Sequence, residues 1–305
     1  IACYVGVKSL NLPASSEVIF SPVSCSGSLF AITEANLKPV IVDSMPNSFN
    51  TSWKYIKQAI NRKTSALFLS HIGGIPLDME EIVYECNKLG LPIIEDCSQA
   101  HGSEFDNKKV GSFGDLSVFS FYPTKSLGGF GDAGMICTNN QEYSSKLKKL
   151  RFYGIDKNYT ADIDGYNSRM DEIHAAILRY KLKKLDKNIS ERGKIANYYK
   201  SHIKKNNLKP LNNPPKTRIS NYLIPFLFNG DRDKFQQKLL REGIGTNVSY
   251  RVPIHLMPAY LDLGYKKNDF PKAEEFCQSN ISFPIFDNMP KELPIKVVDV
   301  INQLY

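Results

Sequence analysis

The sequence predicts an α/β protein with a mostly parallel central sheet, followed by a smaller α+β region. Two observations carry this prediction. Short apolar runs of strand length alternate with helical patterns through the first half of the chain, which is typical of a parallel sheet covered by helices. After Asn167 the pattern changes to a long amphipathic helical stretch and then to short strands and helices.

The first half of the chain supplies the elements of the large sheet. Six apolar runs are expected to be buried strands, at residues 17–22, 38–43, 65–71, 91–97, 115–122 and 134–139. Helices are expected between them, at residues 53–60 and 78–89. Asp78 is the expected N-cap of the second helix, and Gly90 is its expected C-cap.

The second half begins with a helical stretch at residues 170–203, in which Ile173, Ile177 and Tyr180 recur at helical spacing. The stretch "NNPPK" predicts a loop. The remaining expected elements are a strand at 221–228, a helix near 231–241, strands near 245–250 and 281–286, and a final helix. We therefore expect a large domain at residues 1–188 and a small domain at residues 189–305.

Composition limits the classes of function. Hydrophobic residues make up 42% and charged residues 23% of the 305, and no apolar run approaches the roughly 20 residues of a membrane span. We expect a cytoplasmic protein, because no signal peptide is recognisable and the six cysteines lack the spacing of a disulfide frame or zinc site. The net charge of +8 is interleaved with acidic residues, which disfavours nucleic-acid binding but suits a small phosphorylated ligand.

Three strand ends are expected to meet at one site. His71, Asp96 and the turn "YPTK" all fall at the carboxyl ends of predicted strands, where ligands collect in parallel sheets. Lys125 follows a buried strand and precedes Gly128, so packed backbone is expected around it. Desolvation there favours a neutral amine, which can form a Schiff base.

Asp96 ends a buried strand, where an unpaired carboxylate costs several kcal/mol. One interpretation makes Asp96 the N-cap of a following helix. The other keeps the carboxylate for a pyridinium nitrogen. With Ser120 five residues before Lys125, the second interpretation matches the layout of a pyridoxal 5′-phosphate (PLP) site.

Six segments closely resemble the nucleotide-sugar aminotransferases of the DegT/DnrJ/EryC1/StrS family. They are "EDCSQAHGS", "GSFGDLSVFSFYPTKSLGGFGDAGMICTN", "LRFYG", "GYNSRMDEIHAAIL", "HLMPAY" and "FPKAEE". The resemblance runs from about residue 4 to the last helix. It implies the PLP-dependent, aspartate-aminotransferase-like fold of fold type I.

The resemblance also implies roles for individual residues. Lys125 matches the lysine that holds PLP as a Schiff base and then moves the proton. Asp96 matches the carboxylate on the pyridine nitrogen, Gln99 a neighbour of the ring, and Ser120 a phosphate ligand. Asn167 matches a phosphate ligand that comes from the neighbouring subunit, which implies a homodimer.

Other site residues match less closely. Tyr250 and His255 lie in a segment that resembles one reaching the sugar nucleotide, although His255 also suits an ordinary loop histidine. Cys25 stands where many relatives place an aromatic that stacks on the PLP ring. We expect His71 to pack near the floor of the site and His174 to be structural. No metal site is expected.

The implied reaction moves an amino group from glutamate to the keto sugar of a nucleoside-diphosphate sugar, with pyridoxamine phosphate as the intermediate form of the cofactor. "KSLGGFGDAG" resembles members acting on 3-keto rather than 4-keto sugars. Products of this kind serve surface polysaccharide or glycoside biosynthesis. One alternative is a regulatory or structural dimer without catalysis. A PLP-dependent sugar dehydratase is disfavoured, because those relatives replace the lysine with histidine.

One segment departs from the family pattern. The family has a Ser-Gly-Thr turn that opens a helix and holds the cofactor phosphate. Here "YVGVKS" runs almost directly into "LNLPASSEVIF", so we expect most of that helix to be missing. The hypothesis is that residues near Lys8 and Ser9 are omitted from the chain.

Overall fold

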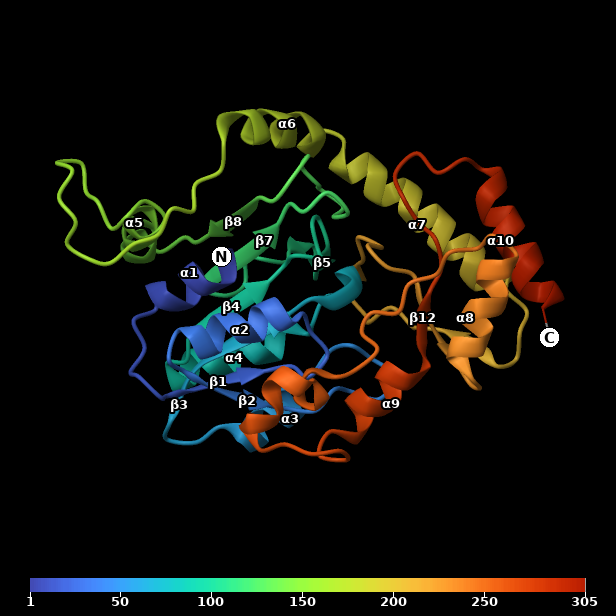
Figure 1. The fold of residues 1–305 in the computed structure, drawn as a ribbon, viewed down its shortest axis with the longest axis horizontal. Helices are drawn as coiled ribbons and strands as arrows, with labels where there is room; N and C mark the ends of the chain where they lie inside the picture. The colour runs from blue at the N-terminus through green and yellow to red at the C-terminus, as the bar shows by residue number, and fades with distance from the viewer. Residues whose placement is uncertain (305) are drawn as a thin grey trace.

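A six-stranded sheet organises the first half of the molecule, which a computed structural model describes for residues 1–304 (Figure 1). The strand order is β2-β1-β3-β4-β7-β8. Every neighbouring pair is parallel except β7 and β8, which are antiparallel. The predicted α/β class and all six predicted strands are confirmed, but the last strand, β8, has no buried residue and so is not the buried strand that we expect. The strands are β1 Glu17–Phe20, β2 Lys38–Ile41, β3 Thr64–Ser70, β4 Ile93–Asp96, β7 Leu116–Ser120 and β8 Gly134–Cys137.

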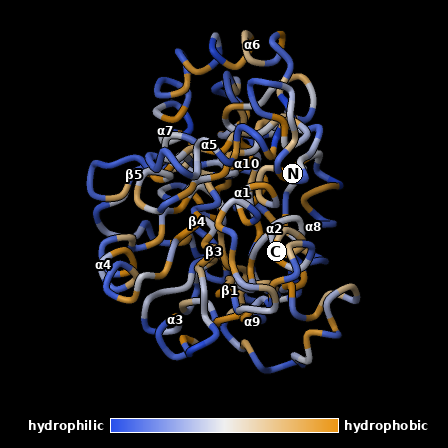
Figure 2. Tube along the Cα trace, turned by 90° about the vertical axis from the view of Figure 1, so that its left-hand side faces the viewer, coloured by the Kyte–Doolittle hydropathy of each residue, from blue (hydrophilic) through white to orange (hydrophobic). Residues whose placement is uncertain are grey.

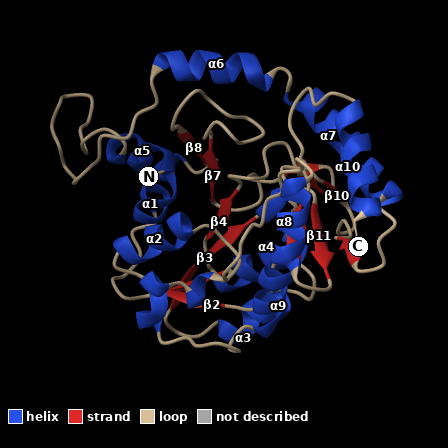
Figure 3. Ribbon diagram, turned by 45° about the vertical axis from the view of Figure 1, so that its right-hand side comes forward, coloured by secondary structure: helices blue, strands red, loops and turns tan. Residues whose placement is uncertain are grey.

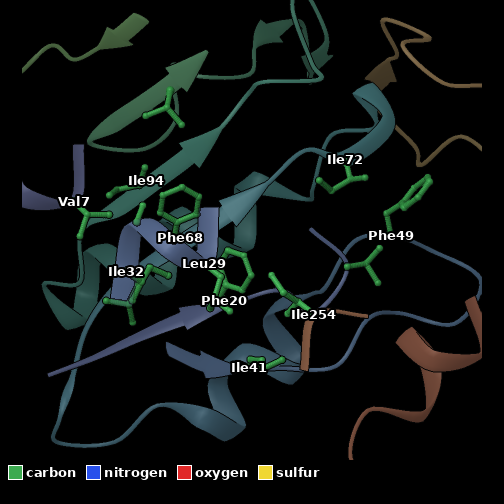
Figure 4. Packing of buried hydrophobic residues seen from close by; sticks show 14 of the residues in the cluster. Val7, Phe20, Leu29, Ile32, Ile41, Phe49, Phe68, Ile72, Ile94 and Ile254 are labelled. Atoms are coloured by element: carbon green, nitrogen blue, oxygen red, sulfur yellow. The ribbon is translucent and has the colours of Figure 1, made fainter. Parts of the chain in front are cut away.

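Helices cover both faces of this sheet, which explains why its strands read as continuous apolar runs. The helices of this half are α1 Ala2–Ser9, α2 Ser26–Glu34, α3 Trp53–Ala59, α4 Met79–Leu89 and α5 Gln141–Leu150. Alternate strand residues face opposite sides. Phe20 and Phe68 pack with Leu29 of α2 (Figure 4), whereas Ile19 packs with Trp53 of α3 on the other face.

Helix α4 ends as its sequence predicts. Gly90 adopts the left-handed conformation at φ 65°, and its backbone N–H donates to the carbonyls of the last turn. Such a C-cap favours glycine because it has no Cβ. Asp78 occupies the N-cap position, although its side chain makes no capping hydrogen bond.

The start of the chain corrects the sequence analysis. Residues 2–9 form helix α1, and Lys8 and Ser9 are consecutive residues of its last turn. Leu10 N–H donates to the Val7 carbonyl, which continues the helical pattern past Ser9. The expectation that most of this helix is missing is therefore wrong, whereas the omission of residues near Lys8 stays a hypothesis. Val5 and Val7 are buried in the core, and this packing stabilises a helix with β-branched residues.

The second half forms a smaller antiparallel sheet with helices beside it. The order is β12-β11-β9, with β9 Leu208–Pro210, β11 Pro225–Phe228 and β12 Asn280–Ser282. The expected helical stretch divides into α6 Glu172–Leu182 and α7 Leu185–His202, followed by α8 Arg232–Arg241, α9 Pro271–Ser279 and α10 Glu292–Gln303. The strand expected near 245–250 is wrong, because Asn247 makes only an isolated bridge to Ser282.

A third small sheet joins the two halves. Strand β10 Thr217–Arg218 pairs with β5 Glu104–Phe105, which pairs with β6 Lys108–Lys109. Helix α7 runs through residue 188, so the boundary that we expect between two domains falls inside a helix. The division into two domains stays a prediction.

Helix α6 lies at one edge of the molecule, apart from the sheets (Figures 1 and 3). Its trace carries hydrophobic positions (Figure 2), and Ile173 and Tyr180 are 75% and 61% exposed. A monomeric protein rarely exposes neighbouring large apolar side chains without a use for them. Within residues 1–304, no helix has the length and apolar character to span a membrane.

Candidate active site

A cavity of about 1070 Å³ opens at the carboxyl ends of β4 and β7. Parallel strands place their carboxyl ends at one edge of a sheet, so side chains far apart in the sequence meet there. All predicted site residues except His255 line this cavity, namely Cys25, Asp96, Gln99, Ser120, Lys125, Asn167 and Tyr250.

Asp96 is held at the cavity wall by hydroxyl and backbone donors. Its Oδ2 accepts hydrogen bonds from Ser28 Oγ at 2.8 Å and from Ser70 Oγ at 3.4 Å. Its Oδ1 accepts from the backbone N–H of Ser98 at 3.0 Å. The residues after Asp96 form turns rather than a helix, so the N-cap interpretation is wrong. The carboxylate therefore has a fixed orientation at a wall that a ligand can reach.

Lys125 lies in a tight turn after β7. Its backbone N–H donates to the Tyr122 carbonyl at 2.9 Å. A Cβ at Gly128 would lie 2.4 Å from the Pro123 carbonyl oxygen, so the turn requires glycine there. The side chain is half-buried, and Nζ lies 5.0 Å from the centroid of the Tyr222 ring. The amine is thus held between packed backbone and an aromatic face.

Gln99 and Tyr250 form a second polar wall. Gln99 Oε1 accepts from the backbone N–H of Gly73 at 2.7 Å, and Gln99 Nε2 donates to Tyr250 Oη at 3.1 Å. Burial raises the pKa of Tyr250, and the negative charge of Asp96 acts in the same direction. Tyr250 therefore presents a neutral hydroxyl.

Ser120, Cys25 and Asn167 lie nearer to the rim. Ser120 is the last residue of β7 and is half-buried, while Cys25 precedes α2 and is exposed. Asn167 is exposed and forms an isolated backbone bridge with Phe152. Its side chain can therefore reach a ligand or another molecule.

His255 does not join these residues. Its ring is fully buried, Nε2 lies 3.1 Å from Glu274 Oε1, and Phe270 packs edge-on at 4.7 Å. This packing away from the cavity corrects the interpretation of His255 as a substrate ligand. His71 lies at the cavity wall with its ring fully buried, while His174 on α6 lies outside the cavity.

Sequence reasoning missed two groups that the structure brings to the cavity. Ser28 and Ser70 orient Asp96, but each comes from another element and shows no sequence signal. Lys148, Arg151 and Arg169 also line the cavity. Within residues 1–304, none of these three cations has a carboxylate at ion-pair distance. An anionic ligand would meet them unneutralised.

A buried cluster of His71, Glu95 and Cys97 has ligand atoms within 4.8 Å of one another. Hydrogen bonds already occupy the donors and acceptors of its first two members. Leu77 N–H donates to His71 Nδ1, which leaves the proton on Nε2 to donate to Glu95. Burial raises the pKa of the Cys97 thiol. We assign no metal to this cluster.

The cavity residues fit PLP. Lys125 offers an amine for the aldehyde, Asp96 offers a carboxylate for the ring nitrogen, and Ser120 offers a hydroxyl for the phosphate. Ala2 and Cys3, in the first turn of α1, also line the cavity.

Comparisons with known proteins agree with this geometry. Residues 2–302 match the model of the DegT/DnrJ/EryC1/StrS aminotransferase family. The "Pleiotropic regulatory protein" of Geobacillus stearothermophilus is 34% identical over 100% of this chain and 82% of its own length. The dTDP-3-amino-3,6-dideoxy-alpha-D-galactopyranose transaminase of Aneurinibacillus thermoaerophilus is 35% identical over 97% of this chain and 81% of its own length.

The crystal structure of S. venezuelae DesV in complex with a ketimine intermediate has a TM-score of 0.95 and 31% identity, covering 99% of this chain and 81% of DesV. This similarity confirms the predicted fold of type I.

Proposed function

The chain belongs to the DegT/DnrJ/EryC1/StrS aminotransferase family, whose members depend on PLP, and we propose that it transfers an amino group from glutamate to the keto group of a nucleoside-diphosphate sugar. The observation that carries this proposal is the meeting of Lys125, Asp96 and Ser120 in one cavity. A second cavity of about 1010 Å³ is lined by Lys209 and Glu275, but its carboxylate is exposed.

Bound PLP supplies an aldehyde that captures amines and a ring that withdraws electrons from the carbon losing its proton. Lys125 Nζ would anchor the cofactor and, once released from it, would take up and return the proton of the reacting carbon. Because the turn fixes the backbone of Lys125, the released amine would stay close to the reacting carbon. One side chain thus serves as anchor and general base.

Asp96 would keep the ring nitrogen of bound PLP in its charged form. The donors Ser28 and Ser98 fix the carboxylate so that it needs little rearrangement when the ring arrives. Gln99 and Tyr250 form the neighbouring wall and orient the ring. Ser120 would offer its hydroxyl to the phosphate.

The sugar nucleotide is proposed to lie toward Lys148, Arg151 and Arg169, whose charges suit a diphosphate. A 3-keto-6-deoxy sugar is the favoured acceptor. The segment after Lys125 resembles that of members acting on 3-keto sugars, and the A. thermoaerophilus relative is named for a 3-amino sugar.

We also propose a homodimer in which Asn167 reaches the neighbouring active site. The exposed Asn167 side chain and the exposed apolar residues Ile173 and Tyr180 support this arrangement. Light scattering tests it. A dimer that dissociates in a charged double variant, Ile173→Glu with Tyr180→Glu, is expected, and a monomeric wild type would contradict the proposal.

A regulatory protein without catalysis is the second candidate, because the G. stearothermophilus relative is named a regulatory protein. One experiment separates the two candidates. The protein is incubated with PLP, glutamate and a panel of 3-keto and 4-keto nucleotide sugars, and the products are identified by mass spectrometry. We expect an aminated 3-keto sugar, which Lys125→Ala does not form. No aminated product from any acceptor would favour the regulatory role.

A further inference from the structure

The aromatic ring of Tyr222 meets the amine of Lys125 from the second half of the chain. Lys125 Nζ lies 5.0 Å from the ring centroid, within the range of a cation–π interaction. Tyr222 is half-buried and is not among the residues that line the cavity. This contact links the amine of Lys125 to the second half of the chain.

The segment Ile219 to Leu223, here the 219–223 segment, is fixed to the large sheet's loops at both ends. Ser220 N–H donates to Ser103 Oγ at 3.0 Å, and Leu223 N–H donates to the Gly73 carbonyl at 3.3 Å. Ile219 and Leu223 are themselves buried in the main core. The backbone on both sides of Tyr222 is therefore anchored.

Two further features hold the middle of the 219–223 segment. Asn221 adopts a left-handed conformation at φ 52°, and its carbonyl accepts from Arg192, which pairs with Asp287 at 2.7 Å. A Cβ at Gly74 would lie 2.2 Å from Ser220 Oγ, so the close approach of this segment requires glycine there. A segment tied this closely can hold a ring in one place.

We propose that Tyr222 is a positioning residue whose ring face holds the charged amine of Lys125 in place when the amine is not attached to cofactor. This proposal rests on the proposed function of Lys125. A lysine side chain has four rotatable bonds and a mobile head group, so a free amine would otherwise leave the position that proton transfer needs. The ring attracts the charged amine without forming a hydrogen bond, so the amine remains available.

Three other titratable groups face this pair, namely Asp96, His101 and Tyr250. Burial and the charge of Lys125 lower the pKa of His101 to about 4. Burial raises the pKa of Tyr250. Neither His101 nor Tyr250 changes charge between about pH 6 and 10. A change in lysine reactivity in this range is therefore not caused by His101 or Tyr250.

The test is trace labelling of the full-length, cofactor-free protein with acetic anhydride at a series of pH values. Mass spectrometry quantifies the peptide that contains Lys125. Removing the ring in Tyr222→Leu is expected to move the labelling midpoint to lower pH. Below the midpoint, it should raise the labelling rate about two- to thirtyfold, the range of one cation–π contact. Tyr222→Phe keeps the ring and is expected to keep the midpoint.

The matched control is Tyr84→Leu, which removes the exposed ring that lies 4.0 Å from Lys88 Nζ on α4. It should leave the labelling of Lys125 unchanged. If Tyr222→Leu does not fold, Tyr222→Met gives the same test without a ring. A wild-type midpoint in a folded variant without the ring would overturn the inference. Transamination by Lys125→Ala would instead overturn the proposed function, so the two failures are distinguishable.

Discussion

Glu95 and Asp96 are consecutive buried carboxylates of β4, and they differ in what surrounds them. Glu95 is fully buried, and its oxygens accept from the backbone N–H groups of Gly111, Phe113 and Gly114 at 2.7 to 2.8 Å. His71 adds a fourth hydrogen bond at 3.0 Å. Asp96, on the opposite face, lines the cavity and is held mainly by hydroxyl groups.

The difference teaches how to separate a structural carboxylate from a ligand-binding one. Burial raises the pKa of Glu95, but the hydrogen bonds from His71 and from the backbone N–H groups of Gly114 and Gly111 outweigh this effect and lower the pKa. The carboxylate oxygens of Glu95 accept four hydrogen bonds from protein groups. Three of these bonds hold the loop before β7 against β4. Asp96 is oriented but remains open to a cationic group. Burial alone does not distinguish the structural carboxylate from the ligand-binding one, because both are buried.

The largest expected effect is the loss of activity when a residue of the cavity, on the side that Asp96 faces, is changed. Lys125→Ala removes both the cofactor anchor and the proton carrier, so we expect a loss of transamination of at least about 10³-fold. The unfolding midpoint should change little, because the lysine head group has no hydrogen-bond partner among the described residues. Steady-state assays and thermal melts measure the two quantities. Lys88→Ala on α4 is the control and should retain activity.

Glu95→Gln tests the structural side. The amide removes a buried negative charge and turns one acceptor into a donor that faces backbone N–H groups. We expect a loss of about 3–5 kcal/mol in the free energy of unfolding, measured with urea. Activity per folded molecule should stay within a few-fold of wild type. A stable variant with lost activity would reverse the roles that we assign to the two faces.

Asp96→Asn is the counterpart on the cavity face. We expect a loss of about 10²- to 10³-fold in kcat, because the ring nitrogen loses its charged partner. Stability should change by less than about 1 kcal/mol, since the amide oxygen still accepts from Ser28. Kinetics and urea unfolding are compared with Glu95→Gln. If Asp96→Asn kept full activity, the assigned role of this carboxylate would fail.

The smallest expected effect is on the pH dependence of stability, which separates the contribution of His101 from that of Glu95. The pKa of His101 is lowered from 6.5 to about 4 in the folded protein, so the unfolded chain binds its proton more tightly. Stability should therefore fall as pH drops from about 6.5 to about 4, by about 3 kcal/mol in total. His101→Phe should remove this slope. The loss linked to Glu95 starts lower, below about pH 4.5, and should remain in the variant. An unchanged slope in His101→Phe would contradict this assignment.

The sequence predicts the parts of the site that depend on strand ends. Asp96, Ser120 and Lys125 fall at the ends of β4 and β7, and parallel strands necessarily bring those ends together. The residues that orient them could not be predicted in this way. Ser28 reaches Asp96 from α2, and Tyr222 reaches Lys125 from the second half, so both depend on long-range packing.

Helix α1 and His255 show two further limits of sequence reasoning. The short segment that contains Val5 and Val7 has weak helix propensity, and its burial against the sheet determines its structure. The loop segment of His255 resembles a substrate-binding one, but the buried partner Glu274 holds its ring away from the cavity. Neither packing contact leaves a local pattern in the sequence.

The most direct test of the account is to locate the covalent attachment of PLP. The protein is mixed with PLP, reduced with borohydride, digested and mapped by mass spectrometry. The account predicts one pyridoxyl group per chain on the peptide that contains Lys125, and none there in Lys125→Ala. Attachment chiefly at another lysine, or no attachment, would contradict the claim that this cavity is an aminotransferase active site.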